Sequence, residues 1–356
     1  MIPTVTQHAR TVAVGSAVAM TLALALIAYL IAAGHARASR GETTVLRYQD
    51  FAGRIGVAEL AADLGYLPGL KLQCIGDTTS GAQDIQATVN GDVAFGTAFN
   101  GSILRLAGAG APITAVVAAR GLTPQNRTSF AVRVAGPVRG PRGLIGKRVG
   151  VNTVGAQSED VLDLYLARHG LTPAQIRSVQ PVVLAPDRME PALRAGRVAA
   201  AALTGAPRDT AFAHGGLREL FSDYGLLGRM NADSIVMRDD FVAANPHTVR
   251  TFVSGVARAL AWSARHPRAQ VIARMTRIAR HRTPPVALPH GPGYDVATEG
   301  GVLTRREFAV WLRRLERDGR VPPGAVRLNA LWTNAYNPYA RQSAAVGRQN
   351  RKAPPK

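Results

Sequence analysis

The stretch Ser80-Gly81-Ala82-Gln83, which continues to Asn100-Gly101, predicts a helix and a strand with a loop at each end. Ser80 followed three residues later by Gln83 is a capping-box pattern, so a helix is expected to begin near Gly81. The pair Asn90-Gly91 tolerates the left-handed conformation that ends helices. This stretch therefore predicts one α/β unit, around which the rest of the chain can be arranged.

The second half of the stretch predicts a buried strand and an accessible loop. Val93-Ala94-Phe95-Gly96 is apolar throughout, as expected for a strand that is covered on both faces. The small and polar residues Thr97 to Gly101 follow it, and we expect them to form a loop that a ligand can approach closely.

A later stretch repeats the same plan. Glu190 to Arg194 is helical in pattern, Ala195-Gly196 ends it, Val198 to Leu203 is apolar, and Thr204-Gly205-Ala206-Pro207 forms the loop. Two copies of this order predict two similar α/β domains that face each other, although one such pair can also arise by chance.

Composition supports two ordinary globular domains. The chain has 356 residues, of which 47% are hydrophobic and 19% charged, so it can form sizeable cores. Its single cysteine, Cys74, cannot form an intramolecular disulfide and is expected to be an inert, buried thiol.

The net charge of +20 would suit a nucleic-acid partner, but the basic residues are scattered along the sequence. No recognition helix, zinc-finger spacing or RNP-like motif accompanies them. We therefore interpret the charge as a solvated basic surface and expect no nucleic-acid partner.

The N-terminus carries an export signal. Thr11 to Ala33 is uncharged and apolar, and Ala36-Arg37-Ala38 fits a cleavage site, so residues 1–38 are interpreted as a signal peptide. The apolar run is also long enough to span a bilayer, so an uncleaved anchor formed by residues 11–33 is the alternative. Either interpretation predicts an exported, periplasmic protein.

Strand and helix patterns alternate along the remaining chain, which predicts a mostly parallel sheet in each domain. Pro- and Gly-rich segments suggest where the chain crosses between domains. The expected first domain is discontinuous and the second is inserted in it, followed by a disordered basic tail. The boundaries are 45–125 and 235–340 for domain 1, 126–234 for domain 2 and 341–356 for the tail.

Several short motifs together resemble one family. These are Ser80 to Gln83, Asn90 to Gly96, Gly65-Tyr66-Leu67, Leu144 to Val151 and Gly170-Leu171-Thr172. In this order they resemble the substrate-binding proteins of ABC importers of the nitrate, sulfonate and taurine type, which include thiamine-precursor binders. The resemblance covers about Val45 to Tyr339 and implies a type II periplasmic-binding fold, with two α/β domains around a ligand cleft.

The resemblance also implies which residues contact the ligand. Helix N-termini in such a cleft favour anionic groups. The implied ligand-binding residues are Phe51, Gly53, Ser80, Gly81, Ala82, Gln83, Thr97, Ala98, Gly155, Ala156, Ser158, Thr204 and Gly205. Sulfonate binders often have Gly-Ser with a later His, where this chain has Gly155-Ala156 and Glu159. They often have Trp-Asp-Pro after the second-copy strand, where this chain has Thr204-Gly205-Ala206-Pro207, so the ligand is not named as a sulfonate.

The sequence offers little catalytic chemistry. It has no His-Glu-x-x-His zinc motif, no nucleophile elbow, no Walker A motif and no dinucleotide fingerprint. Asp160 and Asp163 are interpreted as solvated helix carboxylates. We expect no cofactor and no metal.

The leading hypothesis is a monomeric, non-catalytic binding protein. It would deliver a small anionic or zwitterionic organic molecule to an ABC permease in the inner membrane. An enzyme or thiamine-precursor-related protein on the same fold and a membrane-anchored sensory module are the alternatives.

Overall fold

The structure, a computed structural model, describes residues 41–51, 54–78, 80–282 and 294–340. The described residues from Thr44 onward form one compact unit. The expected signal peptide or anchor and the basic tail lie outside the described residues. Within the part of the chain that is described, no helix is both long and apolar enough to cross a membrane.

The strands of the described residues form three sheets. One is a parallel pair, β1-β2; the second has the order β3-β10-β4; the third has the order β7-β6-β8-β5-β9. The strands are β1 (Val45–Phe51), β2 (Lys71–Thr78), β3 (Gly96–Phe99), β4 (Ile113–Leu122), β5 (Thr128–Arg133), β6 (Arg148–Val151), β7 (Gln180–Val183), β8 (Ala200–Thr204), β9 (Leu217–Ser222) and β10 (Met230–Arg238).

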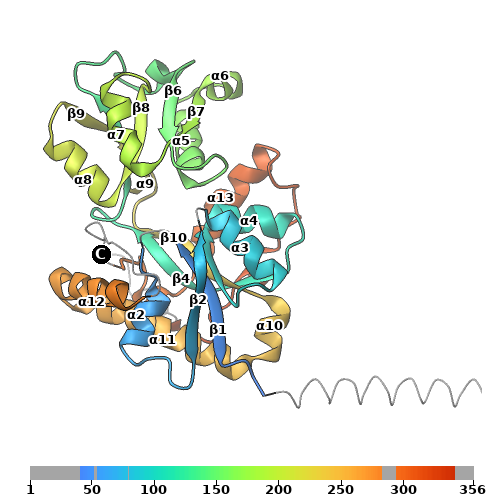
Figure 1. The fold of residues 1–356 in the computed structure, drawn as a ribbon. Coiled ribbons are helices and arrows are strands. Elements are labelled where there is room, and N and C mark those ends of the chain that lie inside the picture. The colour runs from blue at the N-terminus through green and yellow to red at the C-terminus, as the bar shows by residue number, and fades with distance from the viewer. Residues whose placement is uncertain (1–40, 52–53, 79, 283–293, 341–356) are drawn as a thin grey trace, which may run out of the picture. The chain divides into compact units, whose positions relative to one another are not determined.

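We call the elements built on β1-β2 and β3-β10-β4 the first lobe, and those built on the five-stranded sheet the second lobe. Figure 1 shows the two groups. The first lobe has α2 (Val57–Asp63), α3 (Gly81–Asn90), α4 (Asn100–Gly108), α10 (Asp239–Ala244), α11 (Pro246–Arg265), α12 (Arg268–His281), α13 (Arg305–Arg317) and α14 (Leu328–Leu331). The second has α5 (Gln157–Arg168), α6 (Pro173–Ser178), α7 (Pro186–Arg194), α8 (Gly205–Ala213) and α9 (Asp223–Leu227). Short 3₁₀ turns cover Pro141–Leu144 and Glu299–Gly301.

The two lobes repeat one strand order. The amide of Ala94 donates to the carbonyl of Arg47 at 2.8 Å, which places the chain entering β3 beside β1. The amide of Ala199 donates to Arg148 at 2.8 Å in the same way, just before β8. The order β2-β1-β3-β10-β4 in the first lobe thus corresponds to β7-β6-β8-β5-β9 in the second, and the expected repeat is confirmed.

The repeated helices and turns are close to those expected. Ser80 caps α3 by accepting from the Gln83 amide, and Gly91 ends that helix with a φ of 83°. In the second copy α7 ends before Gly196, whose φ is 71°. The left-handed glycines turn the chain back toward the sheet in both copies.

Two expected boundaries were wrong. The strand expected from Val93 is β3, which runs from Gly96 to Phe99. The loop predicted at Thr97 to Gly101 is therefore the end of β3 and the start of α4. Likewise, Thr204 ends β8, and Gly205 to Pro207 begin α8 rather than a loop. Apolar residues that lead into a strand resemble the strand itself, which moved the predicted edges.

Aromatic stacks fill the cores of both lobes. In the first, Phe95 packs between Tyr48 and Phe252, with ring centroids 5.5 and 4.6 Å away. In the second, Phe221 stacks on Tyr165 at 3.7 Å and on Phe130 at 4.3 Å. The tryptophans, by contrast, belong to the first lobe: they lie in α11 (Trp262), in α13 (Trp311) and just after α14 (Trp332).

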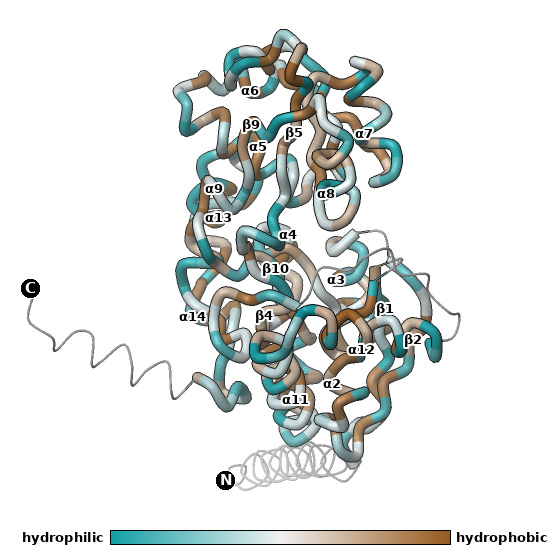
Figure 2. The backbone as a smooth tube through the Cα atoms, turned by 90° about the vertical axis from the view of Figure 1, so that its left-hand side faces the viewer, coloured by the Kyte–Doolittle hydropathy of each residue, from teal (hydrophilic) through white to brown (hydrophobic). Residues whose placement is uncertain are grey.

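The lobes are connected near the chain crossings. The segment between β4 and β5 is one crossing, and β10 begins soon after α9 on the return. β10 pairs antiparallel with β4, from Met230 opposite Leu122. In addition, α13 of the first lobe lies beside α5 and α9 of the second (Figure 2), and Arg306 donates to the Leu227 carbonyl at 2.7 Å. The proposed domain limit at 126 falls in the segment between β4 and β5, whereas the limit at 234 falls inside β10; both domain limits remain a prediction.

Candidate functional site

The candidate site of the first lobe is formed where α3 begins beside β3. Ser80 holds the Gln83 amide at 3.2 Å, while Gly81 lies against the strand. A Cβ atom at Gly81 would lie only 2.6 Å from the Cβ of Ala98 and 2.8 Å from its Cα. The structure therefore brings together Ser80, Gly81, Thr97 and Ala98, as expected, and Gly81 has a packing role in addition.

Most of the expected ligand groups at this helix start remain accessible. Ser80, Gly81 and Thr97 are half-buried, while Ala82 and Gln83 are exposed. Ala98 is buried behind Gly81, so its side chain serves the core. Small residues here leave the backbone approachable, which agrees with a site that a ligand contacts through backbone groups.

A buried carboxylate lies directly beneath this junction. The Thr97 amide donates to Asp84 Oδ2 at 2.7 Å, while Asp84 Oδ1 has no hydrogen-bond partner among the described residues. Burial raises the pKa of Asp84 to about 7, against the lowering effect of the Thr97 N–H group. Asp84 was not among the expected site residues.

A second acid, Asp50, lies at the end of β1 beside Phe51; it is half-buried, but its Oδ2 atom is buried. Asp50 accepts from the Phe51 amide at 2.7 Å, and its other oxygen has no hydrogen-bond partner within the described part of the chain. Burial, and then the neighbouring carboxylate of Glu59, raise the pKa of Asp50 to about 8. Phe51 itself is half-buried, and Gly53 lies outside the described residues.

Cys74 lies in β2, opposite Tyr48 of β1. Its Sγ atom is half-buried and 2.9 Å from a guanidinium nitrogen of Arg282, a side chain that is itself buried. The thiol is thus in a strand, as expected, but less buried than the apolar sequence around it indicates.

In the second lobe the expected residues lie at two helix starts. Ala156 precedes α5 and Thr204 precedes α8. Thr204 is exposed and its hydroxyl does not cap the helix. The Ser158 hydroxyl, in contrast, is buried and donates to Asn152 Oδ1 at 3.1 Å. Thr204 therefore offers a hydroxyl group to a ligand more readily than Ser158 does.

The start of α5 is covered by arginines of the first lobe. Arg105 of α4 donates to the Gly155 carbonyl at 2.8 Å and binds both oxygens of Asp160, at 2.5 and 2.6 Å. Arg320, which follows α13, binds Asp160 at 3.1 Å, Glu159 at 3.0 Å and Asp163 at 3.3 Å. The expectation that Asp160 and Asp163 are solvated was wrong, because the Asp160 side chain is only 3% exposed and both are ion-paired.

Arg120 makes a second connection between the lobes. It binds both oxygens of Asp233 across β4 and β10, at 2.7 and 2.9 Å, and also donates to the side chain of Gln157. Gln157 in turn donates to Asp223 Oδ2 at 2.8 Å. Burial disfavours the charge of Arg120, but Asp233 keeps the pKa of the guanidinium above its ordinary value.

These connections were missed because each joins residues far apart in the chain. Arg105 and Asp160, for example, belong to different helices with no shared sequence pattern. One signal was available, since Arg120 is a charged residue at the end of an otherwise apolar strand. Among the described residues, no group of three or more His, Cys, Asp or Glu side chains is arranged to hold a metal ion.

Comparison with known proteins identifies the family of this chain. Residues 59–270, more than half of the chain, match the family described as NMT1/THI5 like. No protein with a curated description matches the sequence.

Solved structures share the fold at low identity. The alkanesulfonate-binding protein SsuA from Xanthomonas axonopodis pv. citri, bound to MOPS, is 21% identical with a TM-score of 0.62, over 83% of this chain and 100% of that one. The periplasmic nitrate-binding protein NrtA from Synechocystis PCC 6803 is 13% identical with a TM-score of 0.60, over 88% and 90%. The desulfurization enzyme DSZB is 16% identical with a TM-score of 0.52, over 86% and 100%. The expected periplasmic-binding fold is therefore confirmed.

Proposed function

Because the chain belongs to the NMT1/THI5-like family, and its fold is that of SsuA and NrtA, we propose that it is a solute-binding protein of an ABC importer. It captures a small anionic or zwitterionic organic molecule between the lobes and delivers it to a membrane permease. It works outside the cytoplasm, as the apolar N-terminal segment of the sequence indicates. It has no catalytic step and acts as a monomer.

One observation supports this proposal most strongly: each lobe presents a helix start at the end of a buried strand. In the first lobe this is Ser80-Gly81 beside Thr97, and in the second it is Thr204-Gly205 at the end of β8. Backbone N–H groups at helix starts bind anionic groups, and the exposed Thr204 hydroxyl adds a further hydrogen-bonding group. Gly155-Ala156 contributes at the side of the site where Arg105 and Arg320 join the lobes.

The arginines around α5 suggest how the lobes move. Arg105, Arg120 and Arg320 belong to the first lobe, and their partners Asp160, Gln157 and Glu159 lie in the first turns of α5. These contacts hold one edge of the second lobe while the two crossings allow rotation. Closure around the ligand is then a hinge motion, as is usual for binding proteins.

Two acids of the first lobe, Asp50 at the end of β1 and Asp84 in α3, favour a ligand that can also donate a hydrogen bond. Asp50 and Asp84 each have one oxygen without a hydrogen-bond partner in the described part of the chain. A ligand with an anionic group and a separate N–H or O–H donor would satisfy helix starts and acids together. This is why the proposal includes zwitterions.

The proposal can be tested with a defined panel of probes. Nitrate, MOPS, short alkanesulfonates and amino-sulfonates would be screened by thermal shift, and any stabilising compound would be titrated by calorimetry. Thr204→Val should then weaken its binding by roughly five- to a hundredfold, since a lost hydrogen bond to a buried group costs ~1–3 kcal/mol.

Thr210 is an exposed threonine of α8, the helix that follows Thr204. Thr210→Val is therefore the matched control and should leave the affinity unchanged. If both variants bind a probe as the unchanged protein does, the ligand is not held at Thr204. If one of the probes is chemically converted during the titration, the protein is an enzyme on this fold and the non-catalytic assignment is wrong.

A further inference from the structure

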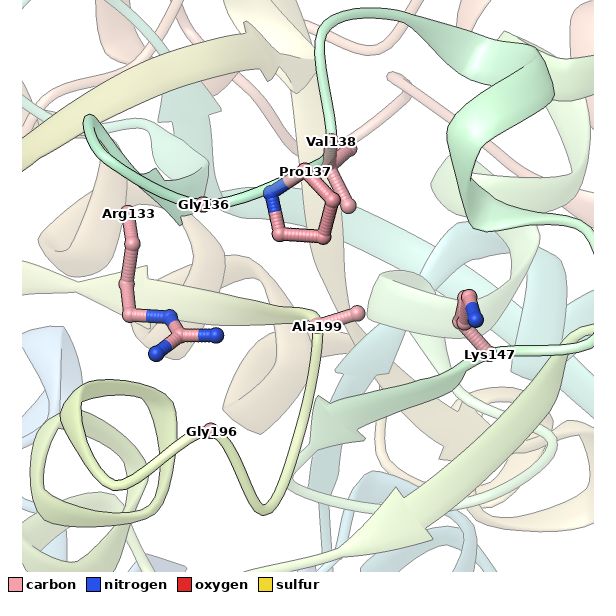
Figure 3. A pocket seen from close by; sticks show the side chains of 7 residues that line it. All are labelled: Arg133, Gly136, Pro137, Val138, Lys147, Gly196 and Ala199. Carbon is pink, nitrogen blue, oxygen red and sulfur yellow. The ribbon is translucent and has the colours of Figure 1, made fainter.

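A small pocket lies in the second lobe, away from the candidate ligand site. It encloses about 170 Å³, and its lining residues are Arg133, Gly136, Pro137, Val138, Lys147, Gly196 and Ala199. Figure 3 shows Arg133 and Lys147 on two sides of it, with Gly196 and Ala199 between them. Lys147 directly precedes β6 and Ala199 directly precedes β8, so the pocket is at the opposite end of these strands from Thr204.

The Arg133 side chain lies against two glycine turns. A Cβ atom at Gly196 would lie 3.2 to 3.4 Å from the guanidinium atoms, and one at Gly136 would lie 3.2 Å from the Arg133 Cβ. Any larger residue at either turn would press on this side chain. Gly196 also has a φ of 71°, a conformation that glycine adopts without strain. The turns therefore leave room for the Arg133 side chain.

The charged groups that line the pocket are positive, and among the described residues neither of them has a carboxylate partner. Among the pocket-lining residues the ionisable side chains are Arg133 and Lys147, both cationic. The sequence from 128 to 158 contains no Asp or Glu. Two further arginines are engaged with backbone carbonyls nearby: Arg139 donates to Val134 and Arg218 donates to Val138, each at 2.7 Å. Since the pocket has far more room than one water molecule needs, it can admit a small polyatomic ion.

The corresponding place in the first lobe shows what is unusual here. Arg238 ends β10 as Arg133 ends β5, and Arg238 lies over the Gly91 turn as Arg133 lies over the Gly196 turn. The strand registers agree, because Val236 pairs with Gly96 and Ala131 pairs with Ala201. Arg238 has a carboxylate partner, Asp240, at 2.5 Å. Among the described residues, Arg133 has no such partner.

We propose that this pocket is a binding site for a small oxyanion of the phosphate or sulfate class. The anion takes the place that Asp240 occupies beside Arg238, with the Arg133 guanidinium as a two-pronged donor and the Lys147 ammonium as a second charge. Charge-assisted hydrogen bonds from arginine fit tetrahedral oxyanions well. The site is independent of the ligand held between the lobes.

The test compares two variants that lose the same charge. Inorganic phosphate is titrated by calorimetry, at low ionic strength, into the full chain and into Arg133→Gln and Arg238→Gln. Arg133→Gln should weaken phosphate binding about tenfold or more, whereas Arg238→Gln should leave it within about twofold. Lys147 is an exposed residue of a turn. Lys147→Met should therefore also weaken phosphate binding severalfold, with an unchanged melting temperature.

Absence of phosphate and sulfate binding to the unchanged protein overturns the proposal. So does binding that Arg133→Gln and Lys147→Met leave intact, because the anion would then sit elsewhere. If Arg133→Gln does not fold, the Lys147→Met result decides alone.

A phosphate group can also be part of an anionic lipid headgroup. Vesicles of phosphatidylcholine with and without phosphatidylglycerol distinguish the two sources. A loss of vesicle binding in Arg133→Gln that exceeds the loss in Arg238→Gln assigns the pocket to the headgroup. Equal losses, with the phosphate titration as expected, assign it to a free anion.

Discussion

The two copies of the repeated unit end in different chemistry at the same position. In the first lobe β3 passes into α4 through Phe99-Asn100, and in the second β8 passes into α8 through Thr204-Gly205. Phe99 is buried and packs edge-on against Trp311, with ring centroids 4.9 Å apart. Thr204, its counterpart, is exposed.

Asn100 makes the contrast clearer. It is fully buried, accepts from the Ser234 hydroxyl at 2.7 Å and donates to the Asn231 carbonyl at 3.3 Å, both on β10. The first junction is thus joined to the strand that returns from the second lobe, while the second junction has a glycine and an open hydroxyl. The same strand-to-helix junction is thus a buried structural contact in the first lobe and an accessible surface in the second.

The largest expected effect comes from breaking the structural joint. Asn100→Ala would leave the Ser234 hydroxyl and the Asn231 carbonyl buried without this partner, which should lower the free energy of unfolding by about 2–4 kcal/mol. Thr204→Val at the open junction should change it by less than about 0.5 kcal/mol. Urea unfolding of both variants measures the difference, and similar values for the two would contradict the assigned roles.

A smaller effect should appear in the pH dependence of stability, because the copies also differ beneath the junction. Buried Asp84 in α3 corresponds to buried Met189 in α7. The pKa of Asp84 is about 7 in the folded protein and about 3.9 when unfolded. Between these values the unfolded chain has lost the proton that the folded protein keeps, so this group lowers the free energy of unfolding as pH rises from 4 to 7.

Asp84→Asn removes this titration. Between pH 5 and pH 8 the unchanged protein should lose about 2.5 kcal/mol of stability more than the variant does. Denaturant unfolding at both pH values measures it. Other buried acids act in both proteins and cancel in the comparison, so parallel pH profiles would mean that Asp84 is already ionised in the folded state at pH 5.

The smallest effect is expected at Gly81, where the first copy packs its helix start onto β3. Gly81→Ala would press a methyl group onto Ala98 and should cost about 1–2 kcal/mol, provided that neighbours shift to relieve the contact. Ala82→Ser, one residue later and exposed, is the matched control and should be nearly neutral. A thermal melt of each suffices, and equal melting temperatures would show that the contact relaxes without cost.

The repeated α/β plan, the helix caps and most element types could be predicted from the sequence, because they depend on local patterns. Ser80 and Gln83, and the glycines at 91 and 196, are examples whose roles are set by residues close in the chain. Strand edges were less certain, since Val93 to Phe95 is as apolar as β3 itself.

The electrostatics of the site could not be predicted in the same way. Whether Asp160 is solvated or ion-paired depends on Arg105 and Arg320, which other helices bring to it. The same holds for Arg133 and Arg238. Each is the last residue of its strand, and the sequence does not show that, within the described part of the chain, only Arg238 has a carboxylate partner, Asp240. Charge pairing is a property of the assembled lobes rather than of any single segment.

The placement of the tryptophans has a practical consequence for spectroscopy. Because Trp262, Trp311 and Trp332 all belong to first-lobe elements, the intrinsic indole emission of the protein reports on that lobe. The second lobe has tyrosine and phenylalanine in its core, as in the stack of Tyr165, Phe221 and Phe130. A thermal melt monitored by tryptophan fluorescence would report unfolding of the first lobe but not of the second. Far-ultraviolet circular dichroism would report both. A Phe221→Trp substitution would allow tryptophan fluorescence to report on the second lobe as well.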